Sequence, residues 1–369
     1  MYKRQTDHSL ITCSDADIGA CFPDVVWHAE MPVLRTSPAP MFLLSGLVRQ
    51  HGFKVVLTGE GADEVLAGYN IFKEAKVRRF WARQPDSPWR PLLLHRLYPY
   101  VGTLGRSSDA YLRAFFGQGL AETESPHYSH FIRWRNTSRL WGLFSSSQRA
   151  AIGEYDPVAE FQTHLDGDFR RWSGLAQAQY IEITIFMSEY LLSSQGDRMT
   201  AAHSVEGRYP FLDHRVLEFC AQLPPYLKLR GLQEKYLLKR AVRDILPPIV
   251  WQRPKQPYRA PIGESFFGGP EGDPQPYVEE MLSAEQVQET GYFDPRKVDL
   301  LVRKAHRQRL GEVDQMAVAG VLSVQLLDHL FGRGFRPRSG DDLSPMKIVR
   351  EQAQSCFLRE PCRTRSPRR

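Results

Sequence analysis

The sequence has few cysteines and no long apolar run, and both features narrow the classes of protein that it can encode. Its five cysteines are odd in number and scattered, without a C-x-x-C pair or a histidine at metal-ligand spacing, so they indicate neither a disulfide framework nor a structural zinc site. The longest apolar runs, such as residues 41–44, are far shorter than the roughly 20 residues of a membrane-spanning helix. The opening MYKRQTDHSL does not resemble a secretory signal peptide. We therefore expect a cytoplasmic protein without a membrane partner.

Net charge is nearly absent outside the C-terminal end. Residues 347–369 contain seven basic and two acidic residues, which account for five of the six net positive charges. The pI near 9.0 therefore does not predict a nucleic-acid partner. With 369 residues, 42% of them hydrophobic and 24% charged, the chain can bury a sizeable core. We expect one domain over residues 1–335 and a basic, disordered tail over residues 336–369.

A helix, a strand and a glycine-rich turn follow one another near the N-terminal end. Ser37 before Pro38 is typical of a helix N-cap, and Gly52 is a natural left-handed stop for that helix. Residues 54–57 then predict a strand, buried on both faces of a parallel sheet. Together they make the second half of a βαβ unit, whose first strand and loop are expected upstream. Residues 1–36 do not show that pattern and form an atypical start.

Most of the remaining chain has helical patterns. Residues 75–170 are rich in Arg, Trp, Tyr and Pro and predict a mostly helical insertion. Helical periodicity is clearer at Ile181, Ile185 and Leu192, and again in residues 234–246 and 316–331. The expected fold class is therefore α/β, with a partial Rossmann-like parallel sheet and a large α-helical portion.

Charged side chains gather in three short stretches. KVVLTGEGADEVLAGY, residues 54–69, carries acidic side chains directly after the strand, at the edge where α/β sheets bind ligands. DRMTAAHSVEGRYPFLDH, residues 197–214, combines two arginines with a glutamate, although composition alone favours a salt-bridged helix junction there. WQRPKQPYRAP, residues 251–261, sets Lys255 between prolines in an extended loop, which could equally be a structural connector.

Four stretches in this order resemble the synthetase domain of glutamine-hydrolysing asparagine synthetases. They are LTGEGADEVLAGY, DRMTAAHSVEGRYPFLDH, LPPYLKLRGLQEKYLLKRAV and LPPIVWQRPKQPYRAPI. The resemblance covers residues 35–261, although residues 75–170 match poorly. It implies an adenine-nucleotide α-hydrolase-like fold that binds ATP, forms β-aspartyl-AMP from aspartate and releases asparagine when ammonia displaces AMP. We consider a homodimer as the oligomeric state of the protein.

The resemblance also implies roles for individual residues. Glu60 matches the glutamate linked to the acyl-adenylate, and its carboxylate could take a proton from ammonia. Lys255 matches the lysine that stabilises charge on the phosphate during adenylation. The remaining matches are Thr58 and Gly59 for ATP, Asp63 for Mg²⁺, and Arg198, Glu206, Arg208 and Lys235 for the substrate pocket.

Two family features have no counterpart in the sequence. The pyrophosphate loop S-G-G-x-D-S is missing, since the one adjacent glycine pair is Gly268-Gly269, and Tyr2 stands where the glutaminase domain has its cysteine nucleophile. We therefore expect a fragment of a longer amidotransferase. The alternatives are an inactive remnant that binds a nucleotide or a partner, or an enzyme like the β-lactam synthetases. The latter have tyrosine at the position of Glu60, so Glu60 favours asparagine synthesis.

Overall fold

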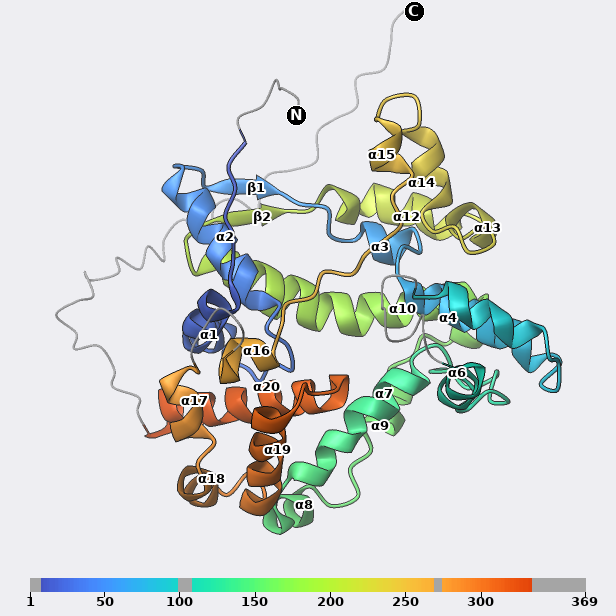
Figure 1. The fold of residues 1–369 in the computed structure, drawn as a ribbon. Helices are drawn as coiled ribbons and strands as arrows, with labels where there is room; N and C mark the ends of the chain where they lie inside the picture. Colours follow the sequence, from blue (N-terminus) through green and yellow to red (C-terminus); the bar gives the residue numbers. More distant parts are fainter. Residues whose placement is uncertain (1–7, 99–107, 269–273, 334–369) are drawn as a thin grey trace, which may run out of the picture.

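The computed structural model describes residues 8–98, 108–268 and 274–333, and these residues are mostly helical (Figure 1). They contain one sheet, in which β1 (Val55–Leu57) pairs in parallel with β2 (Glu206–Arg208). The α/β class is therefore confirmed in a coarse form, with the helical part much larger than the sheet.

The elements before β2 are α1 (Asp15–Ala29), α2 (Pro38–Gln50), α3 (Ala62–Val65), α4 (Asn70–Ala82), η1 (Arg90–Arg96), α6 (Asp109–Phe116), α7 (Phe131–Ser138), η2 (Arg139–Leu143), α8 (Ser146–Ile152), α9 (Pro157–Thr163), η3 (Phe169–Arg171), α10 (Gly174–Ile181), η4 (Glu182–Asp197) and α11 (Arg198–Ala201). The elements after β2 are η5 (Pro210–Leu212), α12 (His214–Gln222), α13 (Pro225–Lys228), α14 (Tyr236–Ala241), α15 (Pro248–Trp251), α16 (Gly263–Phe267), α17 (Pro276–Met281), α18 (Ala284–Thr290), α19 (Pro295–Arg307), α20 (Glu312–Leu327) and η6 (Asp328–Arg333).

The two strands are less buried than their sequence predicts. Val55 is 39% and Leu57 70% exposed, and because alternate residues of a strand point the same way, both lie on one face of the sheet. The prediction of a strand buried on both faces is therefore wrong for the described residues. Aliphatic strands are buried where helices cover both faces of a parallel sheet, and among the described residues no helix covers this face.

The ends of α2 agree with the sequence only in part. Pro38 begins the helix as predicted, and Gly52 has a φ of +81°, the left-handed conformation expected beyond a helix end. Ser37, however, has helical dihedral angles, and its side chain makes no capping hydrogen bond. Ser37 therefore stands at the predicted N-cap position but does not act as a cap, because its backbone is already helical.

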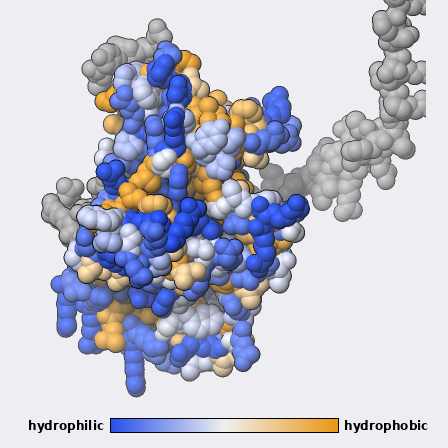
Figure 2. Space-filling view, turned by 90° about the vertical axis from the view of Figure 1, so that its right-hand side faces the viewer, coloured by the Kyte–Doolittle hydropathy of each residue, from blue (hydrophilic) through white to orange (hydrophobic). Residues whose placement is uncertain are grey.

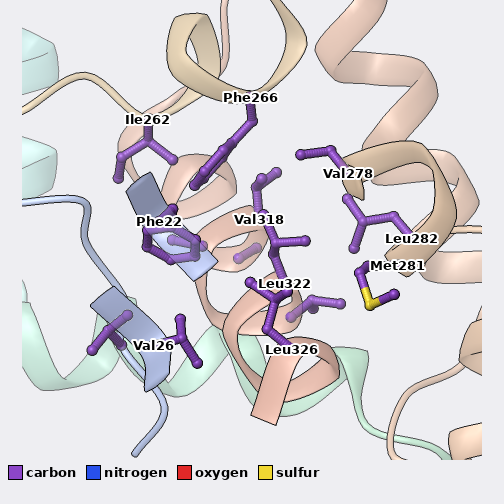
Figure 3. Close-up of a cluster of buried hydrophobic side chains, with 14 of the residues drawn as sticks. Phe22, Val26, Ile262, Phe266, Val278, Met281, Leu282, Val318, Leu322 and Leu326 are labelled. Carbon is purple, nitrogen blue, oxygen red and sulfur yellow. The ribbon is translucent and has the colours of Figure 1, made fainter. Parts of the chain in front are cut away.

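The largest hydrophobic cluster joins the N-terminal helix α1 to the C-terminal helices α16–α20 (Figure 3). Phe22 of α1 is fully buried, and its ring packs edge-on against Phe266 of α16 at 4.9 Å between centroids. A capping box, in which Ser14 and Asp17 hydrogen bond to each other's backbone N–H, begins α1. Segments about 240 residues apart in the sequence therefore share one core.

The described residues of the segment predicted as an insertion are mostly in helices, and a buried arginine organises them. Arg78 of α4 is fully buried, and its guanidinium donates to the backbone oxygens of Phe116 (3.0 Å), Gln118 (2.6 Å) and Tyr128 (3.0 Å). A buried guanidinium is stable only when its donors have partners. Arg78 thus fixes the segment after α6 against α4.

Two of the later helical predictions are confirmed, whereas residues 234–246 are helical only in α14, residues 236–241. Residues 174–197 make one continuous helical rod in Figure 1, but its longer C-terminal part, η4, is a π-helix. Residues 316–331 fall in α20 and η6, and α20 is buried on most of its surface. Within the described ranges no helix is both long and apolar enough to cross a bilayer. The tail over 336–369 lies outside the described residues.

We expect Leu322→Ala in α20 to lower the free energy of unfolding by about 2–5 kcal/mol, because the fully buried side chain would leave a cavity in the cluster shared with α1. Leu300→Ala in α19 is the matched control, since Leu300 is 65% exposed; it should change stability by less than about 0.5 kcal/mol. Urea denaturation of both variants measures this. Equal effects would contradict the shared core.

Candidate functional site

The turn after β1 brings the acidic segment into position for chemistry. Gly61, with a φ of +91°, precedes α3 directly, and a Cβ at this position would lie 2.2 Å from Leu212 Cδ2. Only glycine therefore suits both the backbone angle and the close packing. This turn sends α3 away from the carboxyl end of β1, with Asp63 in its first turn.

Asp63 is paired with two lysines from distant parts of the sequence. Its Oδ1 is 2.8 Å from Lys235 Nζ, and its Oδ2 is 2.9 Å from Lys255 Nζ. The three side chains are only 14–23% exposed, so the pairs are partly shielded from water. Gly68 leaves room for them, because a Cβ there would lie 1.9 Å from Asp63 Oδ1. The structure thus joins the acidic turn, α14 and the proline-rich loop.

Lys235 is held by its backbone as well as by its ammonium group. Its φ of +51° is left-handed, a conformation that costs a non-glycine residue roughly 1–2 kcal/mol. Its N–H donates to Leu66 O at 3.2 Å, directly after α3. This bond and the Asp63 pair oppose the strain and fix where α14 begins.

Lys255 lies where the segment between α15 and α16 passes α3 (Figure 1). Its ammonium also lies 5.3 Å from the centre of the Tyr69 ring, within cation–π range. Its backbone N–H donates to Glu234 Oε1 at 3.1 Å. The loop is therefore held at both the backbone and the side chain, which a solvated connector would not require.

Glu234 is a functional candidate that sequence reasoning missed. It is 3% exposed and pairs with Lys73 of α4 at 2.6 Å and with Lys239 of α14 at 2.8 Å. Burial, the largest influence, disfavours its charge, but hydrogen bonds from Lys239 and Lys73 outweigh burial and lower the pKa of Glu234 to about 2. The sequence held one signal, a glutamate beside Lys235, but nothing pointed to Lys73.

The six side chains linked by these ion pairs form what we call the lysine cluster: Asp63, Lys73, Glu234, Lys235, Lys239 and Lys255. With four lysines and two carboxylates, the lysine cluster has a net charge of +2 when all six groups are ionised.

Glu64, the next acid of the turn, has a structural environment. It is 1% exposed and accepts a hydrogen bond from the Tyr69 hydroxyl at 2.7 Å. Burial raises its pKa above the ordinary value, more than that hydrogen bond lowers it. Gln179 of α10 donates to the backbone oxygens of Glu64 and Val65 at 2.6 and 2.9 Å. Neighbouring acids in one turn thus have different tasks, Asp63 holding cations and Glu64 anchoring α3.

Thr58, Gly59 and Glu60 follow β1 directly and are at least partly exposed to solvent. Thr58 Oγ1 donates to Glu60 Oε2 at 3.2 Å, and the Thr58 N–H donates to Arg208 O at 3.0 Å, which extends the parallel ladder. Gly59 is exposed, and a Cβ there would meet nothing within 4 Å. Packing within the protein therefore does not require glycine at this position, whereas a ligand approaching the backbone could.

The four residues assigned to a substrate pocket are divided in the structure. Lys235 lies on Asp63, whereas Glu206 and Arg208 pair with each other at 2.8 Å on β2, both about 60% exposed. Arg198 pairs with Glu30 of α1 at 2.7 Å. It lines an open pocket of about 410 Å³ with Asp197, Ser188, Leu192, Ser193 and Ala201.

Tyr209 links that pocket to the end of β1. Its hydroxyl donates to Asp197, and burial together with the negative charges of Asp197 and Glu60 raises its pKa. A Cβ at Gly207 would lie 2.5 Å from this hydroxyl, so glycine lets the ring fold back along β2. Nothing in the sequence indicated Tyr209 as a site residue, because a tyrosine before proline is not a motif.

The side chains around Asp63 do not provide enough oxygen ligands to hold a metal ion by themselves. Both oxygens of Asp63 are within 2.9 Å of an ammonium group, and the described ranges contain no group of three or more His, Cys, Asp or Glu side chains that could hold a metal. A hard cation such as Mg²⁺ prefers several oxygen ligands. Any Mg²⁺ here would have to bring most of its ligands with it, as it does when bound to a nucleotide.

We expect Glu234→Gln to lower the free energy of unfolding at neutral pH by about 3–5 kcal/mol, because Lys73 and Lys239 would lose a buried counter-ion. The pKa of Glu234 is lowered from 4.5 to about 2, so its stabilising effect is complete above pH 4.5 and is lost as the pH falls toward 2. The difference from the wild type should therefore shrink on acidification.

Chemical denaturation between pH 7 and pH 3 measures that difference. Asp299→Asn removes an exposed ion pair with Arg303 and serves as control; its effect should stay below about 1 kcal/mol at every pH. A difference for Glu234→Gln that does not depend on pH would contradict the assigned pairing.

Comparison with known proteins places this chain in a family. The family model described as asparagine synthase matches residues 2–328. Amidase chyE of Penicillium rubens is 28% identical over 313 residues, which are 81% of this chain and 45% of that protein. A glutamine-hydrolysing asparagine synthetase of Bacillus subtilis is 28% identical over 251 residues, which are 65% of this chain and 36% of that protein.

A putative glutamine-hydrolysing asparagine synthetase of Mycobacterium bovis is 30% identical over 262 residues, which are 69% of this chain and 37% of that protein. The chain thus spans less than half the length of these relatives. Since the family model extends across both the lysine cluster and the shared core of α1 and α20, the chain belongs to the asparagine synthase family.

Proposed function

We propose that this chain carries the ATP-dependent, amide-forming site of an asparagine synthetase, with aspartate as acceptor and ammonia as nitrogen donor. The observation that carries the proposal is the lysine cluster at the carboxyl end of β1 and β2. A net charge of +2 in a partly dehydrated place suits a polyphosphate. Parallel sheets place ligands at this edge. Because the chain belongs to the asparagine synthase family, ATP is the polyphosphate that we propose.

In this proposal the aspartate β-carboxylate oxygen attacks the α-phosphorus of ATP. The new O–P bond replaces the bond to pyrophosphate, which leaves with its electron pair. Ammonia then attacks the acyl carbon, and AMP leaves as the C–N bond forms. Lys255 and Lys235 stabilise charge on the phosphates, Thr58 and Gly59 contact the nucleotide, and Glu60 accepts the proton that ammonia loses.

Mg²⁺ enters the proposal as part of the substrate MgATP. Asp63 is its proposed protein contact, and the phosphates bring the other oxygens. Arg198, Glu206 and Arg208 are proposed to order the acceptor acid. Arg198 supports this idea because it borders an open pocket that Tyr209 connects to the region of Glu60.

The parts of the relatives that this chain does not span are proposed to supply the pyrophosphate loop and the glutaminase. We further propose that β1 and β2 belong to a larger Rossmann-like parallel sheet. The exposed aliphatic face of β1 supports this, because a two-stranded sheet is marginally stable by itself. Figure 2 also shows hydrophobic residues gathered in its upper half, and exposed apolar side chains of the α12–α15 region include Phe219, Ile245, Ile249 and Val250.

Amide hydrolysis is the second candidate, because one of the relatives is named an amidase. A thiol nucleophile would need a low pKa. Burial instead raises the pKa of Cys21 to about 12 and also raises the pKa of Cys13 and Cys220. The described cysteines therefore do not favour thiol-dependent hydrolysis. A measurement of asparagine with and without ATP separates the two candidates. Amide formation produces asparagine and requires ATP, whereas amide hydrolysis consumes asparagine and does not.

We expect Lys255→Ala to lower kcat for asparagine formation by roughly 10² or more in a chain joined to a relative's pyrophosphate loop, because it removes a cation beside the reacting phosphate. Lys297→Ala is the matched control, since Lys297 lies on α19 with Asp294 and Gly142 as partners. Coupled measurement of AMP and asparagine tests this. If Lys255→Ala changed only thermal stability, residues 251–261 would be a structural connector.

Glu60→Gln in the same joined chain should weaken both adenylation and ammonia capture, while leaving the fold intact. Gln keeps the shape of the side chain and its hydrogen bond with Thr58, but it cannot accept a proton. Pyrophosphate release and asparagine formation, measured separately, resolve the two steps. Full turnover by Glu60→Gln would remove the main support for the asparagine-forming reaction over the β-lactam type.

A further inference from the structure

The aromatic ring of Tyr69 lies beside the ammonium group of Lys255, with 5.3 Å between Nζ and the ring centre. The same ammonium group is 2.9 Å from Asp63 Oδ2. In the proposed function Lys255 acts on phosphate oxygens, which are anions and therefore compete with Asp63 for its charge. An aromatic face attracts a cation without neutralising it. The Tyr69 ring can therefore stay in contact with Lys255 while a phosphate takes the place of the carboxylate.

The Tyr69 ring is held in place from several sides. Its hydroxyl donates to Glu64 Oε1 at 2.7 Å, and the ring meets Phe186 of η4 edge-on, at 6.2 Å between centroids. Its backbone is the N-cap of α4, and the turn before it contains Ala67, whose φ of +55° is left-handed. A non-glycine residue keeps this conformation only where the surrounding structure holds it. The ring is thus a fixed surface against which a flexible side chain can be placed.

Lys255 needs such a surface more than Lys235 does. The backbone of Lys235 is fixed in a left-handed conformation and donates to Leu66 O. Lys255 lies in the segment between α15 and α16, where its N–H donates to Glu234 Oε1. The flexible stem of a lysine side chain separates that anchor from its ammonium group. A second contact near the charged end therefore decides where the charge lies.

We propose that Tyr69 is a positioning residue for Lys255, and that its ring face holds the ammonium group in place when a phosphate replaces Asp63 as the counter-ion. This inference rests on the proposed function. Tyr69 acts through Lys255 and not on the reacting atoms. Its hydroxyl has a separate task, the hydrogen bond to the buried Glu64, so that substitutions can separate the ring from the hydroxyl.

The first test measures kcat and KM for ATP separately, in the chain joined to a relative's pyrophosphate loop. Tyr69→Leu removes the ring and should lower kcat about tenfold while KM changes less than about twofold, because Lys255 is misplaced in the transition state. Tyr69→Phe keeps the ring and should retain at least about half of the wild-type kcat. It should nevertheless unfold at a lower temperature, since the buried Glu64 loses its hydrogen-bond donor.

A double-mutant cycle separates positioning from a structural effect. In the Lys255→Ala background, Tyr69→Leu should have no further effect on kcat, because the group that the ring positions is gone. Phe72→Leu is the matched control, since Phe72 belongs to the hydrophobic cluster against which Tyr69 packs. It should lower the melting temperature and leave the kcat of the folded protein unchanged.

Chemical labelling tests the contact itself in the purified 369-residue chain and does not depend on activity. The probe is a limiting amount of acetic anhydride, with acetylation of Lys255 followed by mass spectrometry. The rate should rise at least about threefold in Tyr69→Leu, because the ring no longer covers one side of the ammonium group. It should stay at the wild-type value in Tyr69→Phe and in Phe72→Leu.

The outcomes separate this inference from the proposed function. If the joined wild type forms no asparagine, the proposed function fails and the inference is overturned with it. If the joined wild type is active but Tyr69→Phe loses as much kcat as Tyr69→Leu, the inference is overturned and the proposed function stands. A full loss from Tyr69→Leu in the Lys255→Ala background, an equal loss in Phe72→Leu, or unchanged labelling of Lys255 in Tyr69→Leu would also overturn the inference alone.

Discussion

The carboxylate of Asp63 is the contact on which the arrangement of the site depends. It pairs with Lys235 and Lys255, which are separated from it by 172 and 192 residues. Each lysine belongs to a segment without regular structure at that point, the strained start of α14 and the proline-rich loop. Neither segment has a strand partner or a long helix to place it, so a shared, partly buried counter-ion brings them to the end of β1.

The same contact would be unfavourable without the charges behind it. Four lysines within one cluster repel each other, and dehydration makes that repulsion stronger. Glu234 offsets two of them, and its own charge is stabilised by the pairs with Lys73 and Lys239. Because Glu234 also accepts the backbone N–H of Lys255, one side chain both neutralises the cluster and positions the loop. The excess of two positive charges is the feature on which the proposed polyphosphate site rests.

Helix α4 connects this site with the helical insertion. Its Lys73 faces Glu234, and one and a half turns later its Arg78 binds three backbone oxygens of the following segment. The helical segment is therefore attached to the same helix as the lysine cluster. Changes within it could reach the site through α4 without altering any residue that contacts the proposed ligand.

Local sequence determined much of the structure near the site. The helical pattern after Pro38, the left-handed stop at Gly52, the acidic turn and the long helices all follow from spacing, dihedral preference and apolar periodicity, which act over a few residues. Asp63, Lys235 and Lys255 were selected by resemblance to one family. Their mutual contact, however, could not be deduced from the spacing of charges along the chain.

Tertiary structure alone decided the remaining features. Glu234 and Lys73 look like ordinary surface charges of helices, and their burial depends on segments 161 residues apart meeting. Val55 and Leu57 have the side chains of a core strand, yet they are exposed, because burial is a property of what covers a strand and not of the strand. Whether a charge or an aliphatic side chain is buried depends on long-range packing, which local preferences do not encode.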